Sequence, residues 1–264
     1  MRVSVLGCGW LGLPLAQELV RQGHAVRGSV THAEKLEALA AVGVKGHRLE
    51  LTPSLEGDTG GFFDADALVI TLPPGRREPG VEARYPAQIT AILEATPVGT
   101  QVVFTGSTSV YPELNRTVTE ADAGGPVGAS GRAILAAETL LRDRGATILR
   151  LAGLYGYDRQ PGRRLAGREV SGGDARVNLV HRDDVLRALL RVLGAGVKDA
   201  TFNVCADRHP TRRAVYTRQA ERFGLVPPRF VEPHAQDFKV VSSEALKTAF
   251  DFAFRYPDPL ADAP

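Results

Sequence analysis

The sequence predicts an α/β protein built on a doubly wound parallel sheet with a small C-terminal cap. Three observations support this fold class. Short apolar runs of strand length alternate with longer segments whose apolar residues recur at helical spacing. The run at Ala67–Leu72 is too apolar for an open face, as expected of a parallel strand in a sheet that helices cover on both faces. The chain of 264 residues, 44% of them hydrophobic, is also long enough to bury such a sheet.

The regular alternation occupies the first 151 residues. The run at Arg2–Leu6 breaks into glycines, which predicts a buried strand, and the helical spacing that follows stops at Gly23. Residues 1–151 are therefore expected to form one domain. Its expected strands are Arg2–Leu6, Ala25–Val30, Val44–Leu51, Ala67–Leu72, Val102–Thr105 and Thr147–Leu151, and its expected helices are Leu11–Gln22, His32–Ala41, Val81–Ala95 and Ala129–Arg144.

The pattern loosens in residues 152–264. Glycine- and arginine-rich sequence between Gly153 and Asp174 shows no helical or strand periodicity. We expect this part to supply the remaining strands of the sheet, interleaved with a small substrate-binding cap. Its expected elements are the helices Arg182–Leu193, Arg212–Phe223 and Ser243–Phe250 and the strand Ala200–Val204.

Composition and charge exclude several classes of protein. The net charge of +2 is spread along the chain, so it indicates neither nucleic-acid nor membrane-surface binding. No run approaches the ~20 apolar residues of a membrane span, and the first apolar run is too short for a signal peptide. Cys8 and Cys205 have no spacing typical of a metal site or a disulfide framework. These features predict a cytoplasmic protein.

A glycine pattern, Gly7-x-Gly9-x-x-Gly12, lies between the first strand and the first helix. This context is typical of a Rossmann dinucleotide-binding site. Gly7 permits the tight turn, Gly9 lets the backbone approach a pyrophosphate, and Gly12 lets the helix pack closely on the strand. The helix N-terminus adds N–H groups and partial positive charge. Trp10 and Leu11 complete the predicted turn.

The residues after the second strand indicate which dinucleotide is bound. An NAD site carries a carboxylate about 20 residues after the glycine turn, where it accepts hydrogen bonds from the ribose hydroxyls. This chain has no carboxylate there before Glu34 and instead offers Ser29, Thr31 and Lys35. Hydroxyls and a lysine suit the 2′-phosphate of NADP(H), which a carboxylate would repel. We expect NADP(H) rather than NAD(H), with Glu34 turned inward as the alternative.

Six short motifs follow one another along the chain: Gly7–Gly12, Leu72–Pro74, Ser107–Tyr111, Arg150–Gly156, Val180–Asp184 and Phe202–Val204. Their order and spacing resemble the short-chain dehydrogenase/reductase superfamily over nearly the whole chain. The resemblance is to an atypical member of the extended, NAD-dependent epimerase/dehydratase-like branch. It implies that Leu72, Pro73 and Pro74 line the cofactor site, and that Ser107 lies at the cofactor and polarises the substrate.

The resemblance fails at the acid–base dyad. Active members of the superfamily carry Tyr-x-x-x-Lys on the helix after Ser107, and the lysine lowers the pKa of the tyrosine. The segment Leu135-Ala136-Ala137-Glu138 fixes the register, so Ser130 stands at the tyrosine position and Ile134 at the lysine position. A phenol with a pKa of about 10 is a poor acid–base group at pH 7 without a nearby cation. The usual dyad is therefore absent.

Other polar residues are candidates for its replacement. Tyr155 and Tyr157 are expected where the chain passes the nicotinamide end of the cofactor, which makes them the candidate substitute acids. His181 with Asp183 and Asp184 resembles an acid–base or metal site. The matching segment of the family begins a helix, where aspartates stabilise the free N–H groups, so we expect a structural role and no metal.

Arginines are frequent in the loops expected around the reactive end of the cofactor. They either bind a phosphate or carboxylate of the substrate or are solvated surface residues. The arginines concerned are Arg76, Arg77, Arg159, Arg163, Arg164, Arg168 and Arg176.

Two functional hypotheses follow. The first is an NADP(H)-dependent oxidoreductase or epimerase-like enzyme on a small, anionic substrate, in which Ser107 orients the substrate and water or another group replaces the tyrosine. The second is a non-catalytic NADP(H)-binding redox sensor or regulatory protein.

Related proteins also suggest a homodimer that pairs through the helices Val81–Ala95 and Ala129–Arg144.

Overall fold

The computed structural model describes residues 1–52, 54–75, 79–126, 128–231 and 237–261, and the chain divides into two compact units. Each unit consists of three segments, so the chain passes between the units more often than a single boundary at residue 151 would allow. Unit 1 comprises Met1–Val110, Gly124–Arg150 and Leu186–Thr201, and unit 2 comprises Tyr111–Ala123, Leu151–Val185 and Phe202–Pro264.

The large sheet confirms the doubly wound topology. Its strands are β1 (Arg2–Leu6), β2 (Ala25–Val30), β3 (Lys45–Leu51), β4 (Leu55–Gly57), β5 (Ala67–Ile70), β6 (Gln101–Ser107), β8 (Thr147–Leu151) and β12 (Thr201–Val204). Their order is β12-β8-β6-β5-β1-β2-β3-β4. β1 pairs in parallel with both β2 and β5, while the edge strand β4 is antiparallel to β3. The order therefore reverses at β1 and β5, and such a switch point is where open α/β sheets bind ligands.

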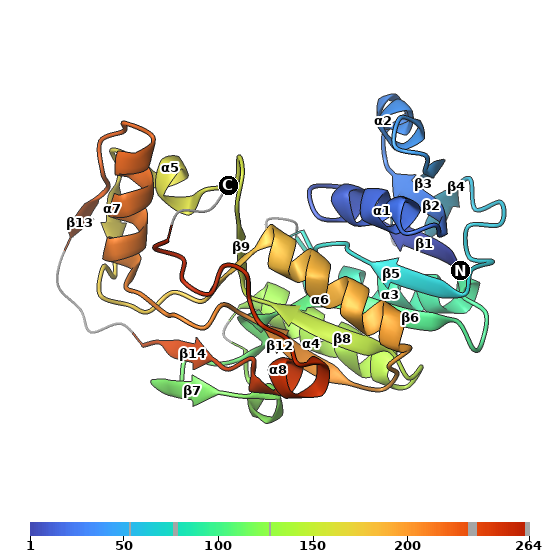
Figure 1. Ribbon diagram of the computed structural model, residues 1–264. Helices are drawn as coiled ribbons and strands as arrows, with labels where there is room; N and C mark the ends of the chain where they lie inside the picture. The colour runs from blue at the N-terminus through green and yellow to red at the C-terminus, as the bar shows by residue number, and fades with distance from the viewer. Residues whose placement is uncertain (53, 76–78, 127, 232–236, 262–264) are drawn as a thin grey trace. The chain divides into compact units, whose positions relative to one another are not determined.

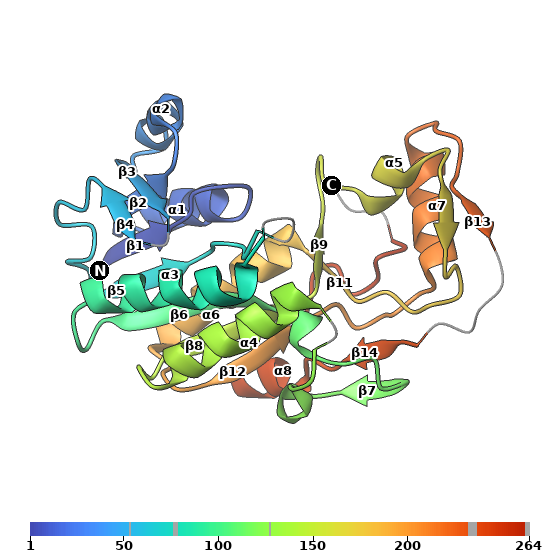
Figure 2. The ribbon, with the colours of Figure 1, turned by 180° about the vertical axis from the view of Figure 1, so that it is seen from behind.

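Helices cover both faces of this sheet. α3 and α4 lie side by side on one face (Figure 2), and α6 lies on the other (Figure 1).

The helix expected over residues 32–41 is a 3₁₀ turn followed by a short α-helix. Within α2, Leu39 is the buried residue, so this stretch has a narrow apolar face. The helices are α1 (Gly12–Arg21), η1 (Ala33–Lys35), α2 (Leu36–Ala40), α3 (Val81–Ala95), η2 (Thr108–Val110), α4 (Ala129–Arg142) and α6 (Arg182–Ala195).

The core of unit 1 lies on the central strands. Val5 on β1, Val69 on β5 and Val103 on β6 are fully buried, and so is Ile148 on β8. β5 is buried at all four of its positions, as its uninterrupted apolar sequence predicts. This rigid centre holds the loops at the carboxyl ends of the strands.

Unit 2 is built from short elements. Three pairs of three-residue parallel strands join distant parts of the chain, namely β9 with β11, β10 with β13 and β7 with β14. The expected loop at residues 153–174 contains β9, α5 and β10. The elements are β7 (Arg116–Val118), η3 (Glu120–Asp122), β9 (Gly153–Tyr155), α5 (Pro161–Leu165), β10 (Glu169–Ser171), β11 (Leu179–His181), α7 (Arg212–Arg222), β13 (Arg229–Val231), β14 (Lys239–Val241) and α8 (Glu244–Phe250). Across the described ranges, none of the helices has the length and apolarity that a membrane crossing needs.

Candidate functional site

The three glycines of the turn after β1 have different surroundings. Gly7 has a φ of +101°, a backbone conformation that L residues rarely adopt. Gly12 packs so closely that a Cβ there would overlap the Gly7 carbonyl oxygen, whereas a Cβ at Gly9 would have no neighbour within 4 Å. The turn is closed at Gly7 and Gly12 and open at Gly9, which is the arrangement that contact with a pyrophosphate needs.

Three strands meet at Gly7. Its N–H donates to Ser29 Oγ at the end of β2 over 2.9 Å, and its carbonyl accepts from the Thr71 hydroxyl after β5 over 2.7 Å. The N–H of Cys8 donates to the Ser29 carbonyl over 2.8 Å. Ser29 is 3% exposed. Its hydroxyl, expected at a 2′-phosphate, is therefore buried and positions the glycine turn.

The thiol of Cys8 lies buried under this turn. Burial raises its pKa to about 12, and its Sγ lies near the Val5 carbonyl at 3.6 Å. Because the thiolate is the reactive form, such a thiol is inert at neutral pH. Cys8 therefore packs under the turn in its thiol form.

The first turn of α1 suits an anion. Its N-cap residue, Leu11, makes no side-chain cap hydrogen bond, and the first turn contains no acidic residue. A helix start of this kind presents N–H groups and the positive end of the helix dipole. Trp10 is half-buried and Leu11 is buried beside it. The turn and the helix together fit the pyrophosphate of a dinucleotide.

Basic residues gather beyond the carboxyl end of β2. Thr31 and Lys35 are exposed there, as is Glu34. Arg48, on the neighbouring strand β3, donates from Nε to the Thr31 carbonyl over 3.4 Å. Sequence reasoning missed Arg48, because only the strand register, which pairs Val30 with Arg48, brings it to this end of β2.

The loop after β5 packs on the glycine turn. The Cδ2 atom of Leu72 lies 2.7 Å from the position that a Cβ on Gly7 would take. The Leu72 carbonyl accepts a hydrogen bond from the hydroxyl of Tyr85 on α3 over 2.8 Å. Pro73 is exposed and Pro74 is buried. α3 thus fixes the loop against the turn.

Ser107 ends β6 with a hydroxyl that can still donate. Its Oγ accepts from the Ser109 N–H over 3.2 Å, which leaves the hydroxyl proton for another acceptor. On α4, Ser130 is half-buried and Ile134 is 4% exposed. A Cβ on Gly106 would lie 3.7 Å from Ile134 Cγ2. An apolar side chain therefore fills the position at which active short-chain dehydrogenases/reductases carry the lysine of their dyad.

A buried ion pair lies one helical turn beyond Ile134. The carboxylate of Glu138 accepts from Arg150 Nη2 and from Arg142 Nη2, each over 2.7 Å. Glu138 and Arg150 are both buried. Burial and, to a lesser degree, the charge of Glu138 raise the pKa of Tyr85. The ion pair joins α4 to β8 and holds the Glu138 carboxylate between two guanidinium groups.

Tyr155 and Tyr157, the expected substitutes for the catalytic tyrosine, belong to unit 2. Burial raises the pKa of Tyr155, whose hydroxyl has no hydrogen-bond partner within the described ranges. Tyr157 is 41% exposed and donates to the Asp183 carboxylate over 3.0 Å. Desolvation and the bond to Asp183 raise its pKa. Neither tyrosine has the lowered pKa that a neighbouring lysine provides in the usual dyad.

The residues around His181 hold the start of α6 in place. His181 is buried; its Nδ1 accepts the Asp183 N–H over 3.3 Å, and its ring centroid lies 4.0 Å from that of Tyr256. The Asp184 carboxylate accepts the N–H groups of Arg255 and Tyr256 over 2.8 and 2.9 Å. Among the residues that the structure describes, no cluster of metal-ligating side chains occurs. These contacts support the structural interpretation of this motif.

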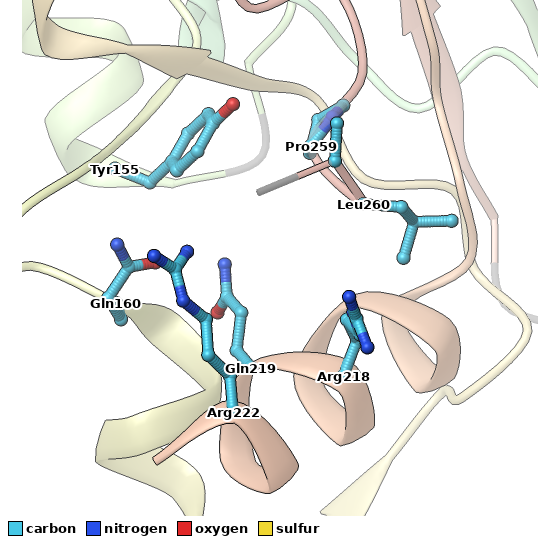
Figure 3. Close-up of a pocket in the computed structure, with 8 residues that line it drawn as sticks. Tyr155, Gln160, Arg218, Gln219, Arg222, Pro259 and Leu260 are labelled. Carbon is cyan, nitrogen blue, oxygen red and sulfur yellow. The ribbon is translucent and has the colours of Figure 1, made fainter. Parts of the chain in front are cut away.

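Two of the pockets in the structure are lined by described residues of unit 2. The smaller one has a volume of about 10 Å³, room for about one water molecule, and its lining comes from β9, α7 and the segment around Pro259 (Figure 3). The larger one has a volume of about 670 Å³. Burial lowers the pKa of His209, so this residue is neutral at pH 7. The larger pocket is lined by Arg176, Asp207, Arg208, His209, Pro210, Val240, Asp258 and Leu260.

The expected arginines are dispersed. Arg176 reaches the larger pocket. Arg163 on α5 lies over the Phe223 ring at 5.2 Å, and Arg159, Arg164 and Arg168 are exposed. Arg76 and Arg77 lie outside the described residues. Arg176 is therefore the expected arginine that the structure places in a pocket.

No family model matches the chain. Protein YeeZ of Escherichia coli K12 is 37% identical to it over 270 residues, which cover 98% of this chain and 97% of that protein. The chain belongs to the YeeZ family.

Solved structures share its fold. UDP-glucuronic acid 4-epimerase from Bacillus cereus, in complex with NAD, matches with a TM-score of 0.79 and 18% identity, covering 98% of this chain and 96% of the epimerase. A short-chain dehydrogenase/reductase superfamily protein from Agrobacterium tumefaciens, with bound NAD, matches with a TM-score of 0.77 and 20% identity. The match covers 97% of this chain and 93% of that protein. These likenesses confirm the extended, epimerase-type fold of the short-chain dehydrogenases/reductases.

Proposed function

We propose that the protein binds NADP(H) and acts as an oxidoreductase or epimerase-like enzyme on a small, anionic substrate. The glycine turn carries the cofactor part of this proposal. It is open at Gly9 and closed at Gly12, and it leads into the uncapped start of α1. When bound, a nicotinamide dinucleotide supplies or accepts a hydride.

The phosphorylated cofactor is favoured by the charge at the end of β2. Lys35 and Arg48 are exposed there beside the hydroxyl of Thr31. The solved structures named above contain NAD, so the preference rests on these side chains alone. Cations and hydroxyls bind a 2′-phosphate, whereas NAD sites use a carboxylate at this place.

Ser107 would orient the substrate. Since its Oγ accepts from the Ser109 N–H, its own proton is available for a carbonyl or hydroxyl oxygen of the substrate. Ser130 and Ile134 supply no strong acid or base, so the proton is moved by water or by a group of the substrate.

The larger pocket of unit 2 carries two arginines, which support the anionic part of the proposal, beside Asp207 and Asp258. Two of its lining residues, Arg176 and Arg208, are permanently charged, and His209 adds a neutral imidazole. Asp207 forms an ion pair with Lys247 over 3.1 Å, which offsets part of the negative charge of the lining. Guanidinium groups bind carboxylates and phosphates in bidentate geometry.

The test is turnover at saturating NADPH or NADP⁺ across panels of carbonyl compounds, hydroxy acids and sugar nucleotides. Ser107→Ala should lower kcat about 10-fold or more, since a lost hydrogen bond to a developing charge costs at least this much, and should leave the Kd of the dinucleotide unchanged. Thr90→Ala, which removes an exposed hydroxyl on α3, is the matched control. Absence of turnover on every panel, or trace activity that Ser107→Ala does not alter, contradicts the enzymatic proposal.

The burial of Ile134 favours a second candidate, a non-catalytic redox sensor. A site that holds the dinucleotide but has an apolar side chain in place of its lysine can bind without reacting. A sensor must bind NADP⁺ and NADPH with different affinities, because a ligand shifts an equilibrium only through its differential affinity. Equal Kd values for the two forms, measured by calorimetry, contradict this candidate.

A further inference from the structure

Arg48 is held across the carboxyl end of β2. The register of β2 and β3 pairs Val30 with Arg48, and the Arg48 carbonyl accepts the Asp58 N–H over 2.9 Å. Its side chain then reaches beyond the end of β2, where Nε donates to the Thr31 carbonyl over 3.4 Å. The backbone of Arg48 is fixed by the sheet while its guanidinium group projects over the strand end.

The remaining donors of Arg48 face no carboxylate. Its side chain is exposed and forms no ion pair with any acidic group in the described part of the chain. Glu34, which follows β2, and Glu50, on β3, are both exposed. A guanidinium group has five N–H donors, so four stay available beside Thr31 once Nε is used.

The ribose next to the adenine of a dinucleotide would lie at this strand end. In the Rossmann arrangement, a pyrophosphate on the glycine turn places the ribose 2′ position beside the residue that follows β2. Ser29 is buried and bonded to Gly7, so it does not serve the 2′ position. Thr31 and Lys35 stay exposed, but both belong to the segment after the strand, whereas Arg48 is anchored in the sheet.

We infer that Arg48 is the residue that selects NADP(H) over NAD(H), by binding the 2′-phosphate with its guanidinium group. This inference rests on the proposed binding of a nicotinamide dinucleotide and assigns its specificity to one side chain. Arginine suits the role because its planar fork matches phosphate geometry, which the point charge of a lysine does not.

The experiment titrates the full-length protein with NADPH and NADH, followed by nicotinamide fluorescence, and displaces NADPH with 2′,5′-ADP or 5′-AMP. Arg48→Met should weaken the binding of NADPH and 2′,5′-ADP by about 10- to 100-fold, the effect of a lost charge-assisted hydrogen bond. The Kd values for NADH and 5′-AMP should stay the same. Arg48→Lys, which keeps the charge and loses the fork, should lie between the wild type and Arg48→Met.

Lys45→Met is the matched control. It removes a positive charge from the same strand, at its amino end, where Lys45 is exposed. It should leave all four affinities unchanged.

The outcomes separate the inference from the proposed function. Equal weakening of NADPH and NADH by Arg48→Met, or no weakening of either, overturns the inference while dinucleotide binding stands. A wild-type protein that binds neither NADPH nor NADH overturns both. Circular dichroism of each variant checks that β3 stays folded.

Discussion

Gly9 and Gly12 differ in the space around them, so the same substitution should affect them differently. Gly9→Ala adds a methyl group with no protein neighbour within 4 Å, so we expect an unchanged melting temperature and weaker dinucleotide binding. Gly12→Ala adds a methyl group that overlaps the Gly7 carbonyl and lies 2.9 Å from Thr71 Oγ1. Overpacking of this kind costs about 1–3 kcal/mol of unfolding free energy.

Thermal unfolding with and without NADPH measures both effects. Gly9→Ala serves as the control for Gly12→Ala, since the two variants carry the same chemical change three residues apart in one turn. A Gly12→Ala protein as stable as the wild type, or a Gly9→Ala protein that melts early, would contradict this picture of the turn.

Residues whose roles depend on local sequence could be predicted, and those that depend on distant contacts could not. The three glycines follow from their motif, and the register at Ser130 and Ile134 follows from four neighbouring residues. Ser29 supports the turn through a hydrogen bond to Gly7, 22 residues earlier. Nothing in the sequence near Ser29 distinguishes a hydroxyl that faces the turn from one that faces a cofactor.

At the scale of elements, the buried ion pair between α4 and β8 should dominate the stability of that contact. Glu138→Ala leaves the buried guanidinium group of Arg150 without this carboxylate, and loss of one partner of a buried pair costs about 3–5 kcal/mol. Chemical denaturation should show this loss as a lower midpoint with an unchanged m value.

The matched control is Glu82→Ala. Glu82 on α3 pairs with Arg132 on α4 over 2.8 Å, and both side chains are about half exposed. Solvent screens such a pair, so its loss should leave the midpoint within experimental error. Equal effects of the two substitutions would show that burial does not set the strength of the Glu138 pair.

The elements of unit 1 could be predicted because they are long and periodic. β1, β2, α3 and β8 have the expected bounds. The strands of unit 2 have three residues each, too few for periodicity, and their partners are far away in sequence. β7 pairs with β14, for example, through Arg116 and Lys239, so only the folded chain defines them.

At the scale of the whole molecule, we propose a homodimer that forms through α3 and α4. The two helices pack against each other and carry exposed small residues such as Ala87 and Ala136 on their outer surface. Small side chains let helices of two copies approach closely. Light scattering after size exclusion should give twice the mass of 28.3 kDa.

A double variant that carries Ala87→Arg and Ala136→Arg should be monomeric, because two large charged side chains would enter the proposed dimer interface. Ala38→Arg, on the exposed side of α2, is the control and should stay dimeric. A wild-type monomer at micromolar concentration would argue against the homodimer.

The junction of three strands at Gly7 would make the proposed dinucleotide a structural ligand as well. The N–H of Gly7 bonds to Ser29 on β2, and the carbonyl of Gly7 bonds to Thr71 after β5. The turn therefore exists only while β1, β2 and β5 stay together. By thermodynamic linkage, a ligand that binds only the folded chain adds about 2.7 kcal/mol at 100 times its Kd. The abundance of this protein in the cell would then follow the size of the dinucleotide pool, since proteases remove the unliganded chain first.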